Sequence, residues 1–206
     1  PPNSLITAFT VGGVAEPMEH DHGSDYDESG VYNFEYVFDC KRNCDASLLA
    51  ASLSTMVVKV YDRSTCSYVT ELSGHMGAIT DIGFFDTDPA ILYSSSSDRT
   101  VRMWDVRSNR EVNRFTVISE AWSTSFGNGS TLCAIGGEGA VFFFDTRNGR
   151  KVGEYIESHN DSVTQVRFHP SVSGQLVSGS EDGLICVFDT SVPSEDDAVV
   201  AILPAE

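Results

Sequence analysis

The stretch "SSSSDRTVRMWD" (residues 94–105) decides the fold, because its pattern recurs along the chain. The runs "VVKVYD", "VRMWD", "VFFFD" and "ICVFD" align on their last residues, which are Asp62, Asp105, Asp145 and Asp189. The intervals between these aspartates are 43, 40 and 44 residues. An acidic residue stands seven positions before each of the last three: Asp98, Glu138 and Asp182. Self-similarity at a fixed period indicates a repeat architecture.

Each repeat of about 40 residues predicts four short strands. Val, Ile and Phe alternate with smaller or polar residues, and Gly, Ser, Asp and Pro mark turns such as 86–90 and 169–174. No long apolar pattern of 3.6-residue period appears, which argues against a parallel sheet crossed by helices. A four-stranded unit cannot bury both of its faces alone, so successive units must stack. The sequence therefore predicts an all-β fold, a β-propeller with about four blades present.

The repeats set the expected boundaries along the chain. We expect four blades over residues 31–201, at about 31–73, 74–116, 117–157 and 158–201, followed by a tail at 202–206. Residues 4–13 ("SLITAFTVGG") are a candidate closing strand, and residues 15–30 predict a solvated acidic loop. Since the chain begins Pro1-Pro2 rather than with Met, we expect a fragment or a processed chain.

Two of the repeats resemble the WD40 repeat. The resemblance is carried by Gly74-His75, the hairpin residue Asp98 and Trp104-Asp105, and by a second histidine, His159, placed 23 residues before Asp182 as His75 is before Asp98. The resemblance implies a hydrogen-bonded set of histidine, second-strand serine or threonine, hairpin aspartate and third-strand tryptophan. The members here are His75, Ser95 or Ser96 (with Ser96 preferred), Asp98 and Trp104, and then His159, Ser178 or Ser180 (with Ser180 preferred) and Asp182.

The other repeats depart from this pattern. Phe188 replaces tryptophan in the last repeat, Glu138 replaces aspartate in the third, and the first has Thr55 and no histidine. Residues 158–200 also resemble a WD40 protein with a longer propeller, which implies that four blades are part of about seven. A histidine beside a serine and an aspartate suggests a catalytic triad, but an active site is normally built only once. Repetition favours a structural network, and we expect no enzyme and no catalytic residue.

Charge and cysteine content limit the partners. The formal net charge is −17, yet every Lys and Arg lies between Lys41 and Arg167, so both flanks are acidic. A nucleic acid or an anionic membrane would be repelled, and no apolar run reaches the roughly 20 residues of a membrane helix. Five scattered cysteines predict a reducing intracellular compartment, cytoplasmic or nuclear. Cys40 and Cys44 lack a second pair for zinc, so we expect no metal. The sequence also has no Gly-rich phosphate loop and no nucleophile elbow, so we expect no cofactor and no small-molecule substrate.

Function is therefore expected to lie in binding other proteins, within a multi-protein complex, as a non-catalytic scaffold. Residues 91–107 resemble the WDxR box of substrate receptors for the cullin-4 ubiquitin ligase, with Asp105, Arg107 and, as a weaker echo, Arg147 as docking residues. A further alternative is association with basic chromatin proteins through the acidic flanks. Ser24 and Ser194 are each followed three residues later by aspartate, which makes them candidate phosphorylation sites.

Overall fold

Sixteen strands and one short helix make up residues 35–205, which are the residues that this computed structural model describes. The chain divides into residues 1–36 and residues 37–206, and every strand belongs to the second unit. The first two sheets contain β1 (Val37–Arg42), β2 (Leu48–Leu53), β3 (Val57–Asp62) and β4 (Tyr68–Ser73), then β5 (Ile79–Phe84), β6 (Ile91–Ser96), β7 (Thr100–Asp105) and β8 (Arg110–Thr116). The third contains β9 (Ser123–Gly127), β10 (Leu132–Gly136), β11 (Val141–Asp145) and β12 (Arg150–Tyr155). The fourth contains β13 (Val163–Phe168), β14 (Gln175–Ser180), β15 (Leu184–Asp189) and β16 (Val199–Pro204), with α1 (Glu195–Ala198) between β15 and β16.

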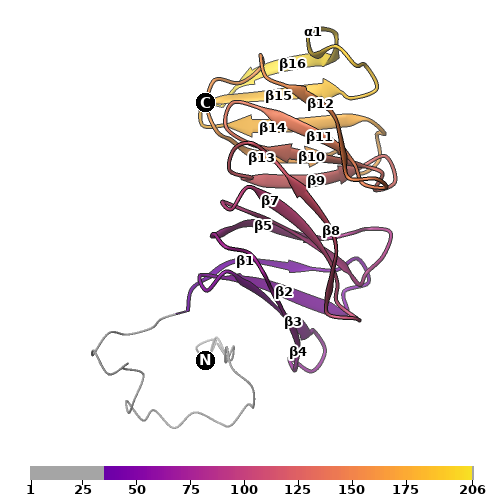
Figure 1. Cartoon of the computed structure of the whole chain (residues 1–206). Coiled ribbons are helices and arrows are strands. Elements are labelled where there is room, and N and C mark those ends of the chain that lie inside the picture. Colours follow the sequence, from indigo (N-terminus) through magenta and orange to yellow (C-terminus); the bar gives the residue numbers. More distant parts are fainter. Residues whose placement is uncertain (1–34, 206) are drawn as a thin grey trace, which may run out of the picture. The chain divides into compact units, whose positions relative to one another are not determined.

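The four sheets are the blades of a propeller. Each is a four-stranded antiparallel meander, and the sheets follow one another in chain order (Figure 1). The first strands β1, β5, β9 and β13 contact one another in succession, so they form the inner side of the stack. The four aligned aspartates end the third strands β3, β7, β11 and β15. The predicted all-β propeller with four blades is confirmed.

One expected segment limit changes. Strand β16 continues to Pro204, which pairs with Leu184, so residues 202–204 belong to the last sheet and not to a tail. The candidate closing strand at 4–13 and the acidic loop at 15–30 lie outside the described residues. Helix α1 has four residues, and in the part of the chain that is described no helix has the length and hydropathy needed to cross a membrane.

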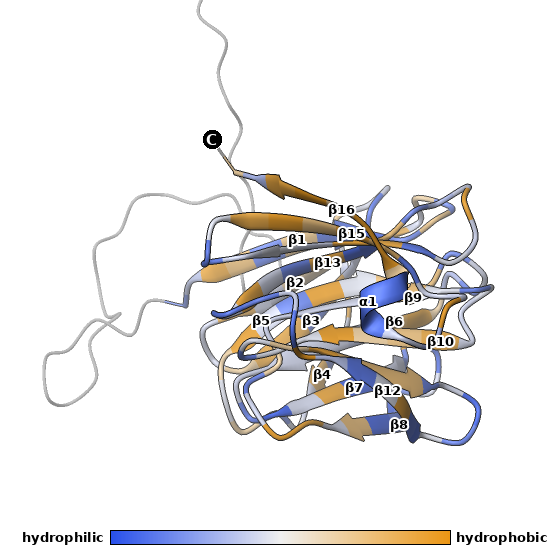
Figure 2. Ribbon diagram, turned by 90° about the horizontal axis from the view of Figure 1, so that it is seen from above, coloured by the Kyte–Doolittle hydropathy of each residue, from blue (hydrophilic) through white to orange (hydrophobic). Residues whose placement is uncertain are grey.

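The core lies between successive sheets. Strand β11 shows why, because consecutive side chains of a strand point to opposite faces. Phe142 and Phe144 pack in the cluster that joins the second and third sheets, whereas Phe143 packs in the cluster that joins the third and fourth. A third cluster, which includes Val60 and Trp104, joins the first and second sheets. Figure 2 shows hydrophobic residues concentrated in the strands and hydrophilic residues in the loops.

A bulge occurs at the same place in every sheet. The pairing of the third and fourth strands shifts register next to the residue that precedes the closing aspartate, at Tyr61, Trp104, Phe144 and Phe188. A bulge increases the local twist of a strand. The repeated aromatic position thus coincides with the bulge of each blade.

Candidate functional site

The second blade brings His75 and Asp98 together with a tryptophan. His75 Nδ1 lies 2.9 Å from Asp98 Oδ2, and His75 Nε2 lies 2.8 Å from Ser94 Oγ. The indole N–H of Trp104 donates to the same Ser94 oxygen at 2.8 Å. An ionised carboxylate can only accept, so Nδ1 carries the imidazole proton and the Ser94 hydroxyl donates to Nε2. A single chain of hydrogen bonds therefore runs from Trp104 through Ser94 and His75 to Asp98.

The serine in this chain is Ser94, and the prediction of Ser96 was wrong. Both side chains lie on the same face of β6, because they are two residues apart. Leu92 pairs with Trp104 across the sheet, so the indole is next to Ser94 and too far along the strand to reach Ser96. The hydroxyl of Ser96 instead accepts from the Asp98 backbone N–H at 3.1 Å, which stabilises the hairpin turn.

The fourth blade repeats the geometry without tryptophan. His159 Nδ1 lies 3.0 Å from Asp182 Oδ2, and Nε2 lies 2.6 Å from Ser178 Oγ. The preference for Ser180 was wrong for the same reason as in the second blade: its hydroxyl accepts from Asp182 N–H at 3.2 Å and donates to a loop carbonyl. The indole donor is absent because Phe188 occupies that strand position.

Burial suits these groups to a structural role. His75 and His159 are 8% and 4% exposed, so neither ring opens onto solvent where a substrate could reach it. Burial lowers the pKa of His75 although Asp98 opposes this effect, which favours the neutral ring. Burial also acts to raise the pKa of Asp98, but hydrogen bonds from Thr100, the Met76 N–H and His75 outweigh it and hold that pKa at about 2. A neutral histidine fixed between a buried serine and an ionised aspartate stabilises the loop that it joins.

The third blade, which lacks the histidine set, is held by a different buried group. Asp81 of β5 accepts from the Ser123 hydroxyl (2.9 Å) and the Thr124 N–H (3.0 Å) of β9. Arg167 of β13 reaches the same carboxylate, with 3.0 Å between Nη1 and Oδ2. Glu138 does not take the role of Asp98: its backbone N–H donates to Ser119 Oγ at 3.1 Å. Three inner strands are thereby joined through one aspartate that is 4% exposed.

The two predicted docking arginines are both exposed on tight turns. Arg107 has a side chain 63% exposed, and it donates to Asp105 (Nε to Oδ1, 3.1 Å) and Asp88 (Nη2 to Oδ2, 3.3 Å). Arg147 is 74% exposed and donates to Asp145 from Nε (2.9 Å) and Nη2 (2.6 Å). The Arg147 guanidinium lowers the pKa of Asp145 to about 2, and Arg107 lowers that of Asp105. Each guanidinium is thus held in a defined orientation while it remains open to a partner.

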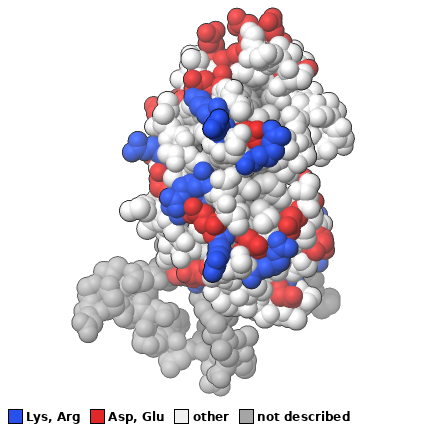
Figure 3. All heavy atoms as spheres, turned by 45° about the vertical axis from the view of Figure 1, so that its right-hand side comes forward, with Lys and Arg blue, Asp and Glu red and all other residues white. Residues whose placement is uncertain are grey.

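Charge on the side of the molecule drawn in Figure 3 is mixed. Lys and Arg alternate with Asp and Glu over the middle sheets, and acidic side chains gather at the end where α1 and β16 lie. Residues 195–197 of α1 supply three of these acids. The Glu195 carboxylate holds the segment after β12, because it accepts hydrogen bonds from the backbone N–H groups of residues 156–158 and from the Ser158 hydroxyl.

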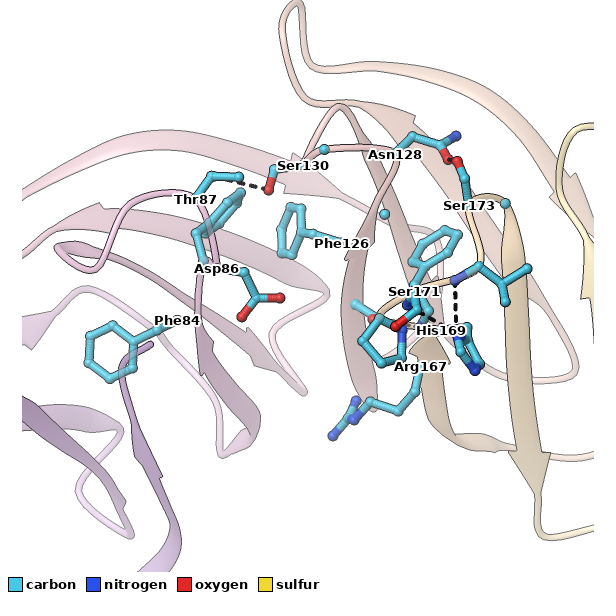
Figure 4. Close-up of a pocket in the computed structure, with 18 of the residues that line it drawn as sticks. Phe84, Asp86, Thr87, Phe126, Asn128, Ser130, Arg167, His169, Ser171 and Ser173 are labelled. Carbon is cyan, nitrogen blue, oxygen red and sulfur yellow. Dashed lines mark hydrogen bonds between the residues drawn. The ribbon is translucent and has the colours of Figure 1, made fainter. Parts of the chain in front are cut away.

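A hollow opens where the first two strands of the second, third and fourth blades are joined. Its volume is about 490 Å³, and it is lined by the loops that follow β5, β9 and β13. Asp86 and Phe126 point into it, and Arg167 and His169 lie on its other side (Figure 4). Two hydrogen bonds link the rim of the hollow across successive blades, one between Thr87 and Ser130 and one from Ser173 to Asn128. The sequence did not predict them, because the partners in each bond are more than 40 residues apart.

The described residues contain no group of three or more His, Cys, Asp or Glu side chains placed to hold a metal. Cys40, Cys44 and Cys66 are exposed free thiols, and burial together with Asp39 raises the pKa of Cys40. Ser194 directly precedes α1, and its carbonyl accepts from the Ala198 N–H at 2.9 Å. The other candidate phosphorylation site, Ser24, lies outside the described residues.

Comparison with known proteins identifies the repeats. The family model for the WD domain, G-beta repeat (WD40), matches residues 66–105 and 149–189. Each match begins beside the fourth strand of one sheet and ends with the third strand of the next, so the sequence repeat is offset from the blade by one strand.

Curated relatives show that this chain matches part of longer proteins. It is 39% identical over 172 residues to WD repeat-containing protein GTS1 of Arabidopsis thaliana, and 37% identical over 160 residues to the WD repeat-containing protein 89 homolog of Dictyostelium discoideum. The matches cover 81% and 78% of this chain but 44% of each relative, so the chain spans less than half their length. The WD40 protein with a longer propeller that residues 158–200 resemble is WD repeat-containing protein 89, and the match to its Dictyostelium homolog confirms this resemblance. A chain in the crystal structure of the mitotic checkpoint complex shares the fold, with a TM-score of 0.74 and 23% identity over 87% of this chain and 52% of that one.

Proposed function

We propose that this chain, which carries WD40 repeats, is a non-catalytic scaffold that binds partner proteins through the loops at the Arg107 end of its blades. WD40-repeat proteins act as protein-interaction scaffolds. The observation that supports the proposal is a division of polar groups. His75 and His159, which stand beside a serine and an aspartate as catalytic groups do, are buried, whereas Arg107 and Arg147 are exposed on ordered turns.

The loops suit binding because the blades hold them in place. Asp105 accepts from both the backbone N–H (2.9 Å) and the guanidinium of Arg107, and Asp145 does the same for Arg147. A side chain that is already ordered loses less entropy when it binds. An arginine fork can form paired hydrogen bonds with a partner carboxylate.

The test compares partners captured by three forms of the full chain by quantitative cross-linking in cells. The paired variant Arg107→Ala with Arg147→Ala should lose partners that the wild type enriches. Lys151→Ala, an exposed cation on outer strand β12 that pairs with Glu154, is the matched control and should keep them. Equal capture by all three forms would contradict the use of these loops. Labelling of Ser94 by a fluorophosphonate probe would contradict the non-catalytic role.

A second, narrower candidate is a substrate receptor for the cullin-4 ubiquitin ligase. The exposed Arg107 follows Trp104-Asp105 in the WDxR pattern, whereas Arg147 follows Phe144-Asp145. In a binding assay with the purified linker subunit of that ligase, Arg107→Ala should abolish binding, and Arg147→Ala should not. Undiminished binding of Arg107→Ala would remove this candidate. Association with basic chromatin proteins through the acidic flanks has less support, because most of the N-terminal flank lies outside the described residues.

A further inference from the structure

The hollow between the loops of the second, third and fourth blades has the size of a binding pocket. Its volume of about 490 Å³ lies within the range of about 300–1,000 Å³ that is usual for ligand sites. Two hydrogen bonds tie the three loops together, Thr87 to Ser130 at 3.3 Å and Ser173 to Asn128 at 3.0 Å (Figure 4). These bonds hold the three loops that form the pocket in place.

One wall of the pocket is aromatic. Phe126 is half-buried, and its ring centroid lies 4.3 Å from that of Phe85 and 4.8 Å from that of Tyr93. The face of an aromatic ring carries negative electrostatic potential, which attracts a cation placed over it. The three rings are tilted against one another and form an aromatic cluster on one side of the pocket, which is a suitable surface for a flat cationic group.

Two oxygens in the pocket have no protein partner. Within residues 35–205, no hydrogen bond or ion pair engages the Asp86 carboxylate, which is exposed and points into the hollow (Figure 4). The Tyr93 hydroxyl is likewise without a hydrogen bond within the described range. Polar groups in partly enclosed sites usually have partners, so these two oxygens are available for a ligand that donates.

Two basic side chains, Arg167 and His169, line the pocket, and neither adds net positive charge to it. Arg167 is paired with Asp81, with 3.0 Å between Nη1 and Oδ2, so the pair adds no net charge. His169 Nδ1 accepts from the backbone N–H groups of Ser171 (3.0 Å) and Val172 (2.9 Å), which requires the neutral ring. The lining is therefore negative by the charge of Asp86.

We propose that this pocket binds an arginine side chain from a basic segment of a partner protein. The guanidinium stacks on Phe126 and donates to the Asp86 carboxylate and the Tyr93 hydroxyl. A planar group with five donors matches an aromatic wall beside a carboxylate better than a compact ammonium does. An anionic ligand is disfavoured by Asp86, and a purely apolar one would leave the two oxygens unpaired. This inference rests on the proposed scaffold function and specifies the chemistry of one partner.

The test uses the isotope-labelled full chain and the peptide acetyl-Gly-Arg-Gly-amide, followed by NMR. The peptide should shift the ring resonances of Phe126 and Tyr93, and the same peptide with citrulline, which has arginine's shape without its charge, should not. Asp86→Asn should weaken binding about tenfold or more, as expected for loss of a charge-assisted hydrogen bond. Phe126→Leu should weaken it roughly threefold. Asp45→Asn removes an exposed acid from the equivalent loop of the first blade and should change affinity less than about twofold.

The outcomes separate this inference from the scaffold function. Equal shifts with citrulline, equal affinity of Asp86→Asn, or no shift at millimolar peptide would each overturn the arginine pocket. Partners captured in cells by the wild type and retained by Asp86→Asn would then leave the scaffold function standing without it. Unchanged circular dichroism and thermal unfolding of the variants show that a loss of binding is not a loss of fold.

Discussion

Replacing Asp98 by Asn tests whether the histidine set stabilises the blade. Asn has the shape of the protonated acid, so the variant should lose the free energy that ionisation of Asp98 contributes to the folded state. A pKa held at about 2 instead of 3.8 corresponds to about 2.5 kcal/mol at pH 7. The side chain is 9% exposed, so solvent screening reduces this value little. We expect the urea midpoint, followed by tryptophan fluorescence, to fall by about 1 M.

The pH dependence of the same variant gives the stricter test. A depressed aspartate pKa stabilises the fold above the unfolded value of about 3.9, and this stabilisation is lost as pH falls toward 2. The stability difference between wild type and Asp98→Asn should therefore shrink between pH 5 and pH 3. Asp182→Asn in the fourth blade removes an aspartate whose pKa is also lowered, so its stability difference from wild type should likewise shrink as pH falls. If the difference at pH 7 is below about 0.5 kcal/mol, or stays constant to pH 3, the reasoning is refuted.

Three other predictions follow from the contacts within and between the blades. Arg167→Ala leaves the buried Asp81 carboxylate without its cation and should cost about 3 kcal/mol, seen as a fall in Tm of about 10 °C; a fall of only a degree or two would contradict this role. Gly136→Ala would place a Cβ against a backbone carbonyl of β13 and should lower Tm clearly, whereas Gly153→Ala, whose Cβ meets nothing within 4 Å, should leave Tm nearly unchanged. Burial lowers the pKa of His75, so its contribution is present above about pH 6.5 and is lost below it; the fall in urea midpoint from pH 7 to pH 5 should be smaller in His75→Asn, and equal slopes would contradict this.

The repeat period predicted the fold because it records a physical requirement. The third strand of each blade packs against neighbouring blades on both of its faces. Apolar runs such as "VFFFD" therefore recur once in each blade. The His75–Asp98 pairing was also predictable, because the resemblance to the WD40 repeat implies a bond between these two residues. The choice between Ser94 and Ser96 was not, because alternation puts both on one face and only the pairing of Leu92 with Trp104 decides.

The ion pair between Asp81 and Arg167 could not be predicted from the sequence, for a different reason. The two residues are separated by 86 positions and by a whole blade, and neither belongs to a repeated motif. Their contact depends on how sharply three inner strands curve, which no local pattern encodes. The pocket has the same origin, since it is formed by loops of three blades.

The third blade lacks the histidine set and is held by these non-local contacts instead. In the second blade, His75 joins the loop before β5 to the hairpin after β6, so it secures one blade internally. In the third blade, Ser123 and Thr124 are secured from outside by Asp81 and Arg167 of the two neighbours. A blade held by both neighbours needs less internal bracing, which allows Glu138 to stay exposed. The same ion pair fixes Arg167 beside the pocket, where it is the only arginine among the described lining residues. The buried carboxylate of Asp81 therefore both stabilises the third blade and neutralises the charge of Arg167.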